Sequence, residues 1–287
     1  MNNVSKKLKE IKKTLIAYMQ LIRVKNCVIV FFAMFIPAAI ALGEISISTK
    51  ILLSASAAFV ITAAGNAFND YYDYVIDKIN RPDRPIPSGK VKRSDAMMLS
   101  FTLFMVGIAI AYKINPFCFA IAVVNVMILI IYARYSKRML LISNFVVSYL
   151  VASIFIFGAI AASGVSQAAP VFVLSACAFL MTFSREIIKD IEDINGDRES
   201  GAETLPIRIG VEKAKNIAVI FSVFAVLLSF LPYIFGLVKH VMYYLVLIII
   251  CDLIFIYSLT KPPKESQKII VIGMVAAMVA FFVSSVF

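Results

Sequence analysis

The chain has 287 residues, of which 61% are hydrophobic and only 16% are charged, and its formal net charge at pH 7 is +11. A soluble globular domain is nearer half apolar and a quarter charged, so this composition excludes an ordinary soluble protein. The basic residues are scattered over short segments between apolar runs, which argues against a nucleic-acid partner. The four cysteines lie far apart inside those runs and give neither a metal-binding spacing nor a disulfide framework.

The N-terminal segment, residues 4–22, carries apolar side chains at helical spacing with five lysines around them. This pattern predicts an amphipathic helix that lies in the membrane interface and leads into a first span. Arg23, Lys25 and Asn26 stand where that span enters the membrane. Arg23 and Lys25 serve equally well as snorkelling anchors or as substrate contacts. The amide of Asn26 has no use as an anchor, so it is the better candidate for binding substrate.

The rest of the chain is divided by apolar runs long enough to cross a bilayer. Because the longest run holds two spans, they predict nine helices, and continuous apolarity excludes short alternating strands. The runs are Asn26–Gly43, Ile51–Asn69, Ala96–Tyr112, Ile114–Ala133, Met139–Ser184, Asn216–Val238, Val241–Thr260 and Ile269–Phe287. The sequence thus predicts an all-α, polytopic membrane protein. We expect a single domain, residues 1–287, with nine transmembrane helices around a central cavity and cytoplasmic cap loops. One isolated acid, Asp252, lies inside the eighth span, and the sequence assigns it no role.

The placement of lysine and arginine predicts the orientation of these spans. If the amino terminus is cytoplasmic, 25 of the 28 basic residues fall in cytoplasmic segments. Only Lys50, Lys113 and Lys239 are left for the outside. This bias predicts a multi-pass protein of the cell membrane and supports nine spans over eight or ten.

The second predicted span ends in a cluster of carboxylates. On a helix, at ~100° per residue, four polar side chains of this segment fall within about 60° of one another. They are Asn66, Asp70, Asp73 and Asp77. The sequence therefore predicts one helical face on which an amide and three acids are stacked along roughly three turns.

A proline-rich basic loop, Lys78–Lys90, follows this acidic face. Its three prolines prevent a regular helix and stiffen the loop. A stiff loop suits cationic side chains that hold an anion over the acidic face, with Arg81, Arg84 and Lys90 as candidates. An ordinary positive cytoplasmic loop is the alternative. We favour anion binding because the loop leaves directly from the acidic face.

The acidic pattern recurs 120 residues later, at the end of the sixth predicted span. The 4-3-4 spacing is the same in Glu186, Asp190, Asp193 and Asp197. A Pro/Gly loop follows each acidic segment, and the two loops correspond at an offset of 121 residues. We interpret spans 2 and 6 as an internal repeat. Because both acidic helix ends fall on the predicted cytoplasmic side, we expect them to form two walls of one site.

The chemistry of such a site follows from its donors. Clustered carboxylates repel one another, and a divalent cation relieves the repulsion. Carboxylate and amide oxygens suit Mg²⁺ or Mn²⁺, which bridges to the phosphates of a substrate. With basic loops beside them, the acids predict a diphosphate site in which metal stabilises a leaving pyrophosphate. An apolar membrane cavity beside that site suits a long allylic chain.

Two motifs carry a family resemblance. The first is Asn69-Asp70-x-x-Asp73-x-x-x-Asp77 with Arg84-Pro85-Ile86-Pro87-Ser88-Gly89, and the second is Asp190-x-x-Asp193-x-x-x-Asp197. They resemble the aspartate-rich motifs of the UbiA superfamily of intramembrane prenyltransferases. The resemblance covers the whole chain and implies a nine-span fold. It also implies transfer of a prenyl group from an isoprenyl diphosphate, with Mg²⁺ between the two motifs.

The resemblance implies roles for individual residues. The implied metal ligands are Asn66, Asp70, Asp73, Glu186, Asp190 and Asp193. The implied catalytic residues are Asp70, Asp73, Asp190, Asp193 and Asp197, with Asp193 or Asp197 as the acceptor of the hydroxyl proton. The implied substrate-binding residues are Arg23, Asn26, Asn69, Asp77, Arg81, Arg84, Lys137 and Lys189.

Within the superfamily, the segment Asp77–Gly89 is most similar to archaeal geranylgeranyltransferases that form digeranylgeranylglyceryl phosphate. The implied reaction moves geranylgeranyl from its diphosphate to geranylgeranylglyceryl phosphate, a lipid-like phosphate acceptor, and makes the second ether bond. An enzyme of the same fold with an aromatic acceptor, a quinone or chlorin precursor, is the alternative. An ion-coupled transporter is disfavoured, because transporters place ionisable groups near the midplane and these acids lie at helix ends. Chain length, the number of metal ions and oligomeric state stay open.

Overall fold

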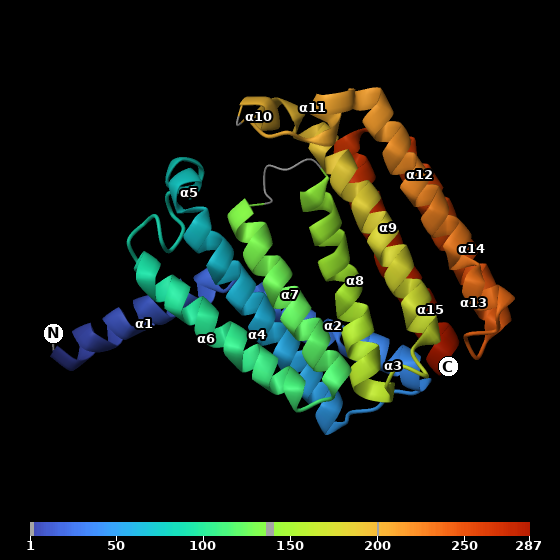
Figure 1. The fold of residues 1–287 in the computed structure, drawn as a ribbon, viewed down its shortest axis with the longest axis horizontal. Helices are drawn as coiled ribbons and strands as arrows, with labels where there is room; N and C mark the ends of the chain where they lie inside the picture. Colours follow the sequence, from blue (N-terminus) through green and yellow to red (C-terminus); the bar gives the residue numbers. More distant parts are fainter. Residues whose placement is uncertain (1–2, 136–140, 200) are drawn as a thin grey trace. The chain divides into compact units, whose positions relative to one another are not determined.

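The computed structural model describes residues 3–135, 141–199 and 201–287, and all regular secondary structure in these ranges is helical (Figure 1). The helices are α1 (Asn3–Leu21), α2 (Val24–Ala33), α3 (Phe35–Leu42), α4 (Thr49–Tyr72), α5 (Tyr74–Asn80), α6 (Arg93–Tyr112), α7 (Pro116–Tyr135), α8 (Ile142–Ser163), α9 (Ala169–Glu192), α10 (Ile194–Glu199), α11 (Leu205–Ile209), α12 (Val211–Ser229), α13 (Leu231–Ile234), α14 (Val241–Leu259) and α15 (Pro263–Val286). The predicted all-α class is confirmed.

Nine stretches of the described residues are long and apolar enough to cross a membrane, which confirms the predicted number. The first stretch joins α2 and α3 and is interrupted at Met34. Pro37 explains the interruption, because its ring has no N–H for the carbonyl of Ala33 and crowds that carbonyl. The amphipathic helix expected before the first span is α1.

The chain divides into two compact units. One comprises Met1–Ala33 and Leu52–Arg134, and the other comprises Met34–Ile51 and Tyr135–Phe287. Each unit has its own apolar core, described separately below. The prediction of one domain is not tested by this division and stays a prediction.

The first unit is packed through two apolar clusters. One cluster joins α1, α4, α6 and the loop between α5 and α6, and the other joins α4, α6 and α7. Glycines allow close approach of these helices. A Cβ at Gly107 of α6 would lie 2.5 Å from the side chain of Ile61 on α4, and Gly65 of α4 faces Leu129 on α7. The end of α4 is thereby fixed against its neighbours.

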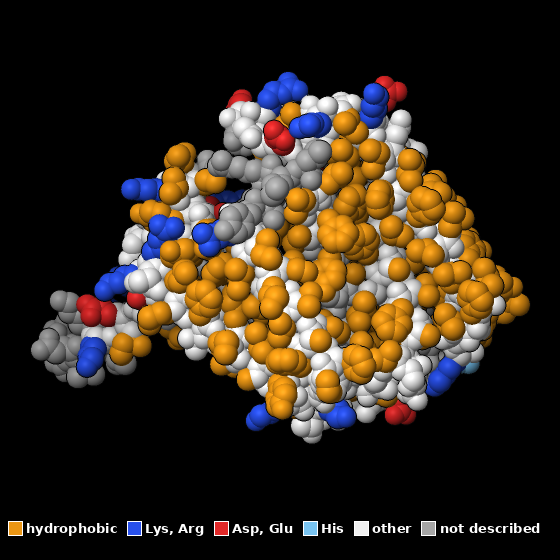
Figure 2. Space-filling model, viewed as in Figure 1, with side chains coloured by type: hydrophobic (Ala, Val, Ile, Leu, Met, Phe, Trp, Pro, Cys, Tyr) orange, Lys and Arg blue, Asp and Glu red, His pale blue; other side chains and the backbone are white. Residues whose placement is uncertain are grey.

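The second unit is organised around α9, which packs against α8, α12 and α15. Its core also includes side chains of α3 and α14. Over the helices of this unit, Figure 2 shows hydrophobic side chains on the flanks and charged side chains near helix ends. Phe224, Leu227 and Leu253 are more than half exposed. Large exposed apolar side chains on a helical flank are the expected lipid-facing surface of a membrane protein.

The two acidic segments have matching backbone structures. Helices α4 and α9 each have 24 residues, and each is followed by a single non-helical aspartate and a short helix. Asp73 has φ −77° and ψ −2°, and Asp193 has φ −88° and ψ 4°. The prediction of one unbroken helical face is therefore wrong at these two residues. At the first break, Arg93 Nε donates to the carbonyl of Tyr71 at 3.2 Å and satisfies one of the carbonyls that a helix end leaves free.

Candidate active site

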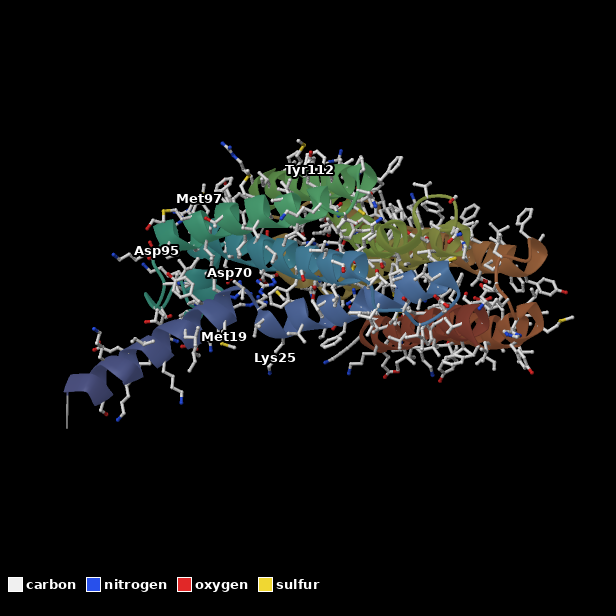
Figure 3. All side chains as sticks on the ribbon, turned by 90° about the horizontal axis from the view of Figure 1, so that it is seen from below. Met19, Lys25, Asp70, Asp95, Met97 and Tyr112 are labelled. Carbon is white, nitrogen blue, oxygen red and sulfur yellow. The ribbon has the colours of Figure 1, made fainter. Side chains whose placement is uncertain are left out.

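Asp70 is the centre of the acidic group in the first unit. It lies near the end of α4 and is only 3% exposed. Its Oδ1 accepts hydrogen bonds from Arg23 Nη2 at 2.8 Å and from Arg84 Nη1 at 3.2 Å. A buried carboxylate is costly without such partners. The two guanidinium groups therefore make a charged Asp70 tolerable beside the α1–α2 junction (Figure 3).

Arg84 brings the basic loop back onto the acidic helix end. Its Nη1 also donates to Asp77 Oδ2 at 2.5 Å, and Asp77 is 5% exposed. The loop is closed by the N–H of Val91, which donates to the carbonyl of Pro85 at 3.0 Å. The structure thus brings together four of the predicted site residues, Arg23, Asp70, Asp77 and Arg84. It leaves Arg81 exposed at the start of the loop.

The junction of α1 and α2 is strained and is tied to α4. Arg23 has φ +52°, a left-handed conformation that costs a non-glycine residue of order 1–3 kcal/mol. Asn66 Nδ2 donates to the carbonyl of Ile22 at 2.9 Å, next to this residue. The strain is therefore held by contacts with α4. Because strained backbone clusters at functional sites, the junction is a candidate part of the active site.

The other candidates of the first unit are less enclosed. Asn69 and Asp73 are half-buried at the end of α4, whereas Lys25 and Asn26 are exposed at the start of α2. Lys25 points away from the neighbouring helices in Figure 3, as a snorkelling anchor would. Arg23, Lys25 and Asn26 line a shallow depression. The predicted substrate contact Lys137 lies outside the described residues.

Asp190 is a half-buried acid of the group in the second unit. Its Oδ2 accepts a hydrogen bond from Nδ2 of Asn144 at 2.8 Å. Asn144 lies on α8 and is 3% exposed. Sequence reasoning missed it. The available signal was one asparagine near the start of the fifth predicted span, an otherwise apolar segment.

Among the remaining acids of this group, Glu186 is paired with two cations. Glu186 accepts a hydrogen bond from Arg185 Nη1 at 2.7 Å, and Lys189 Nζ lies 3.8 Å from its other oxygen. Asp193 is exposed, and Asp197 on α10 is half-buried. Burial raises the pKa of the Asp197 carboxyl, the Asp193 carboxylate adds to the rise, and Lys189 opposes it. Carboxylates close enough to perturb one another suit a bound cation.

Glu192, although acidic, belongs to a different surface. It is exposed, and its Oε2 accepts a hydrogen bond from Gln267 at 2.6 Å. The structure describes no contact between Glu192 and the acids at positions 186, 190, 193 and 197. Glu192 therefore provides a natural control for substitutions in the acidic group.

The donor set fits a hard divalent cation that is completed by substrate. The described residues contain no group of three or more His, Cys, Asp or Glu side chains placed to hold a metal on their own. Mg²⁺ needs no such cage, because it is usually bound through one or two carboxylates, waters and substrate phosphates. In the first unit, Asp70 offers a buried carboxylate, with the amide oxygen of Asn66 about one turn away along α4. In the second unit, Asp190 offers a half-buried carboxylate. The residues present are therefore compatible with metal held jointly with a diphosphate.

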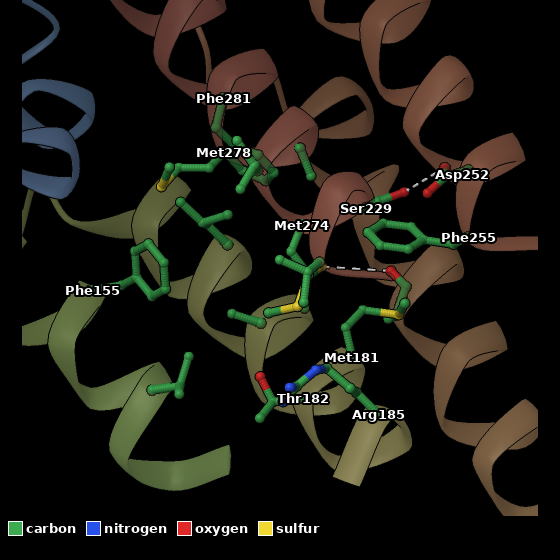
Figure 4. Close-up of a pocket in the computed structure, with 18 of the residues that line it drawn as sticks. Phe155, Met181, Thr182, Arg185, Ser229, Asp252, Phe255, Met274, Met278 and Phe281 are labelled. Atoms are coloured by element: carbon green, nitrogen blue, oxygen red, sulfur yellow. Dashed lines mark hydrogen bonds between the residues drawn. The ribbon is translucent and has the colours of Figure 1, made fainter. Parts of the chain in front are cut away.

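An apolar cavity adjoins the second acidic group. It has a volume of about 420 Å³ and is enclosed by α8, α9, α12, α14 and α15 (Figure 4). Arg185 and Thr182 line one end, and Asp252 and Ser229 interrupt the apolar wall farther along. Arg185 connects the cavity to Glu186 through the hydrogen bond given above. A cavity of this size and character is typical of sites for small apolar ligands.

The sequence model of the UbiA prenyltransferase family matches residues 28–286. The chain belongs to this family. Membership confirms the resemblance predicted from the two aspartate-rich motifs and identifies the chain as a multi-pass membrane prenyltransferase. The predicted alternative of an ion-coupled transporter is thereby displaced by an enzyme.

Two curated members of the family are similar over nearly their full length. Digeranylgeranylglyceryl phosphate synthase of Methanosarcina mazei is 39% identical over 283 residues, which cover 92% of this chain and 96% of the relative. The protein of the same name from Methanococcus maripaludis is 41% identical over 280 residues, covering 94% and 98%. The predicted similarity to archaeal enzymes of this type is confirmed.

Solved structures show the same fold. A structure described as digeranylgeranylglyceryl phosphate synthase in membranes has a TM-score of 0.88 at 37% identity, over 95% of this chain and 99% of that chain. A UbiA homolog from Archaeoglobus fulgidus bound to GPP and Mg²⁺ has a TM-score of 0.70 at 17% identity, over 93% and 99%. At that identity, the second likeness concerns the fold alone.

Proposed function

We propose that the chain transfers a geranylgeranyl group from geranylgeranyl diphosphate to geranylgeranylglyceryl phosphate, forming the second ether bond of archaeal membrane lipids. Relatives of 39% and 41% identity over nearly the whole chain carry the name of this enzyme. The observation that carries the proposal is the matched pair of acidic helix ends, α4–α5 and α9–α10. Each has cations on a carboxylate: Arg23 and Arg84 contact Asp70, and Lys189 lies beside Glu186. Such pairs of acids and bases suit a metal-bound diphosphate.

The proposed cofactor is Mg²⁺, with Mn²⁺ as the related alternative. Its ligands would come from Asn66, Asp70, Asp73, Glu186, Asp190 and Asp193, with oxygens of the diphosphate completing the shell. The Archaeoglobus homolog bound to GPP and Mg²⁺ supports this choice. When bound, the cation would draw charge from the departing diphosphate.

The chain's own residues bind and orient the reactants in this proposal. Arg23 and Arg84 hold Asp70 in place and present further N–H donors to phosphate oxygens. Lys189, beside Glu186, supplies a cation on the second acidic segment. Asn144 fixes the orientation of Asp190 through its 2.8 Å hydrogen bond. Asn69, Asp77 and Arg81 are proposed to complete the polar contacts, and Asn26 is proposed to contact the headgroup of the acceptor.

The chemical step breaks the allylic C–O bond of the donor and forms a C–O bond to the acceptor. The electron pair of the broken bond leaves with diphosphate, and the acceptor hydroxyl oxygen attacks the allylic carbon. A carboxylate must take the hydroxyl proton as that bond forms. We propose Asp193 or Asp197 for this role. The raised pKa of Asp197 favours proton acceptance by this carboxyl.

We also propose that the site faces the cytoplasm. Four spans separate α4 from the end of α9, so the acidic segments that follow them return to the same side of the membrane. The excess of lysine and arginine in the connecting segments on that side supports a cytoplasmic location.

One assay tests the proposed function. Purified protein in lipid nanodiscs receives labelled geranylgeranyl diphosphate and geranylgeranylglyceryl phosphate, with Mg²⁺ or with a chelator. We expect Mg²⁺-dependent formation of the diether. Asp70→Asn and Asp190→Asn should each lower kcat/KM at least about a hundredfold, because each removes charge stabilisation at the leaving group.

The matched controls are Asp83→Asn, in the exposed part of the loop, and Glu192→Gln, which we expect to keep activity. Absence of an ether product with every divalent metal would reject the lipid assignment. Turnover of an aromatic acceptor in its place would favour the alternative enzyme.

A further inference from the structure

Asp252 is a buried acid that the proposed reaction does not use. It lies inside the membrane-spanning helix α14 and is 5% exposed. Ser229 Oγ donates to its Oδ2 at 2.9 Å, and Tyr244 Oη donates to the carbonyl of Ser229 at 2.6 Å. Oδ1 of Asp252 is buried without a hydrogen-bond partner in the described part of the chain. Because intramembrane acids are costly, they mark functional sites by default.

Asp252 and Ser229 form a polar section in the wall of the apolar cavity (Figure 4). The residues of α9 that line this cavity extend from Arg185 to Leu174, on the order of 16 Å along the helix axis. Asp252 lies near Cys177 of α9, which is roughly 12 Å from Arg185 along that axis. The cavity therefore begins at the second acidic group and meets the carboxyl about two turns deeper.

The lining between these two ends is almost entirely apolar. Ala178, Met181 and Phe255 are buried cavity residues of this kind. A hydrocarbon chain gains free energy for each group that it buries against such walls. The gain falls at Asp252 and Ser229, because a hydrocarbon chain that reaches these polar side chains loses apolar contact there and offers them no hydrogen bond.

We propose that this cavity holds the hydrocarbon chain of the prenyl donor and that Asp252, positioned by Ser229, sets the longest chain accepted. This inference rests on the proposed function, because the diphosphate must bind at the acidic group where the cavity begins. Asp252 acts here as a specificity-determining residue and takes no part in bond breaking. The ligand class is a linear isoprenoid diphosphate.

The experiment measures kcat/KM for donors with two, three, four and five isoprene units, with geranylgeranylglyceryl phosphate as acceptor and Mg²⁺ present. In Asp252→Ala we expect the ratio of the five-unit to the four-unit donor to rise at least about tenfold, since one extra methylene in a pocket already discriminates by that much. Asp252→Asn keeps a polar side chain of the same size. It should keep the wild-type ratio.

A second pair of variants tests the same cavity from α9. Ala178→Phe fills the space before Asp252 and should lower the ratio of the four-unit to the two-unit donor at least about tenfold. Ala176→Phe makes the same change two residues away, on an exposed position of the same helix. It should leave the ratio unchanged. If Ala178→Phe does not fold, Ala178→Leu makes a smaller change of the same kind.

The outcomes separate the two proposals. If the wild type forms no product with any donor, the proposed function fails and takes this inference with it. If the wild type is active but folded variants at Asp252 and Ala178 lower kcat/KM equally for all donors, the side chains are structural and the length determinant is overturned. If the donor ratios change in Asp252→Ala and Ala178→Phe but not in Asp252→Asn and Ala176→Phe, the role of Asp252 in setting chain length is supported.

Discussion

Arg84 joins two buried carboxylates that would otherwise repel each other. Its Nη1 lies 3.2 Å from Asp70 and 2.5 Å from Asp77, and its own side chain is 19% exposed. A buried charge pair contributes little net stability to the folded protein. Removing one partner is costly, because the other charge is then left buried and unpaired. Arg84 is therefore expected to support both the fold of the acidic segment and the charge state of Asp70.

Replacing Arg84 with Gln tests this role through stability. The change leaves buried Asp77 without its cation and Asp70 with Arg23 alone, which should lower the free energy of unfolding by about 1–3 kcal/mol. Thermal unfolding in detergent, followed by loss of the soluble monodisperse species, measures the shift in Tm. Arg81→Gln in the same loop is the control, because Arg81 is exposed. Equal Tm values for the two variants would show that Arg84 is not needed by the acids.

Single residues also show where sequence reasoning stops. The spacing of Asp70 and Asp190 marks them as site candidates, and the basic loop predicts a cation nearby. The choice of Arg84 over Arg81 depends on how the loop returns, which no local pattern encodes. Asn144 was missed because a lone amide in an apolar run has no periodicity, although it lies 2.8 Å from Asp190. Partners that come from distant elements become visible only through packing.

At the level of elements, hydropathy predicts the spans and steric detail sets their breaks. Continuous apolar runs are a strong signal, so all nine spans of the described chain were anticipated. The interruption at Met34 follows from Pro37 and could have been predicted. The breaks at Asp73 and Asp193 carry no such residue, and the helical period that grouped the acids assumes an unbroken helix. The similar backbone angles of these two breaks favour the predicted internal repeat.

Close helix packing in the second unit predicts a sensitive glycine. A Cβ at Gly158 of α8 would lie 2.7 Å from Pro37 Cγ and 3.2 Å from the carbonyl of Met34, both on the first span. The proline ring cannot rotate away, so Gly158→Ala should destabilise the protein by about 1–3 kcal/mol. Gly196→Ala on α10 has nothing within 4 Å of its added methyl and serves as control. The comparison uses Tm, and an unchanged value for Gly158→Ala would contradict this packing.

At the level of the whole molecule, charge distribution carries the argument. The chain is 61% hydrophobic and has a net charge of +11. Its lysines and arginines lie mainly outside the predicted spans. The count of spans predicts that the two acidic segments lie on one side of the membrane, and the placement of lysine and arginine agrees with that prediction. One diphosphate can contact both acidic segments only if the two segments lie on the same side of the membrane. Orientation is thus a condition of the proposed reaction.

Cysteine labelling tests this condition directly. In a background in which the four native cysteines are replaced by alanine, single cysteines are introduced at Lys113, Lys78 and Arg198, all exposed positions. Because Lys113 lies in a predicted outside segment, a membrane-impermeant maleimide should label it in intact cells. Lys78 and Arg198, next to the two acidic groups, should react only after the membrane is permeabilised. Labelling of these two positions from opposite sides would rule out a shared diphosphate, whereas labelling of both from outside would reverse the orientation and keep the shared site.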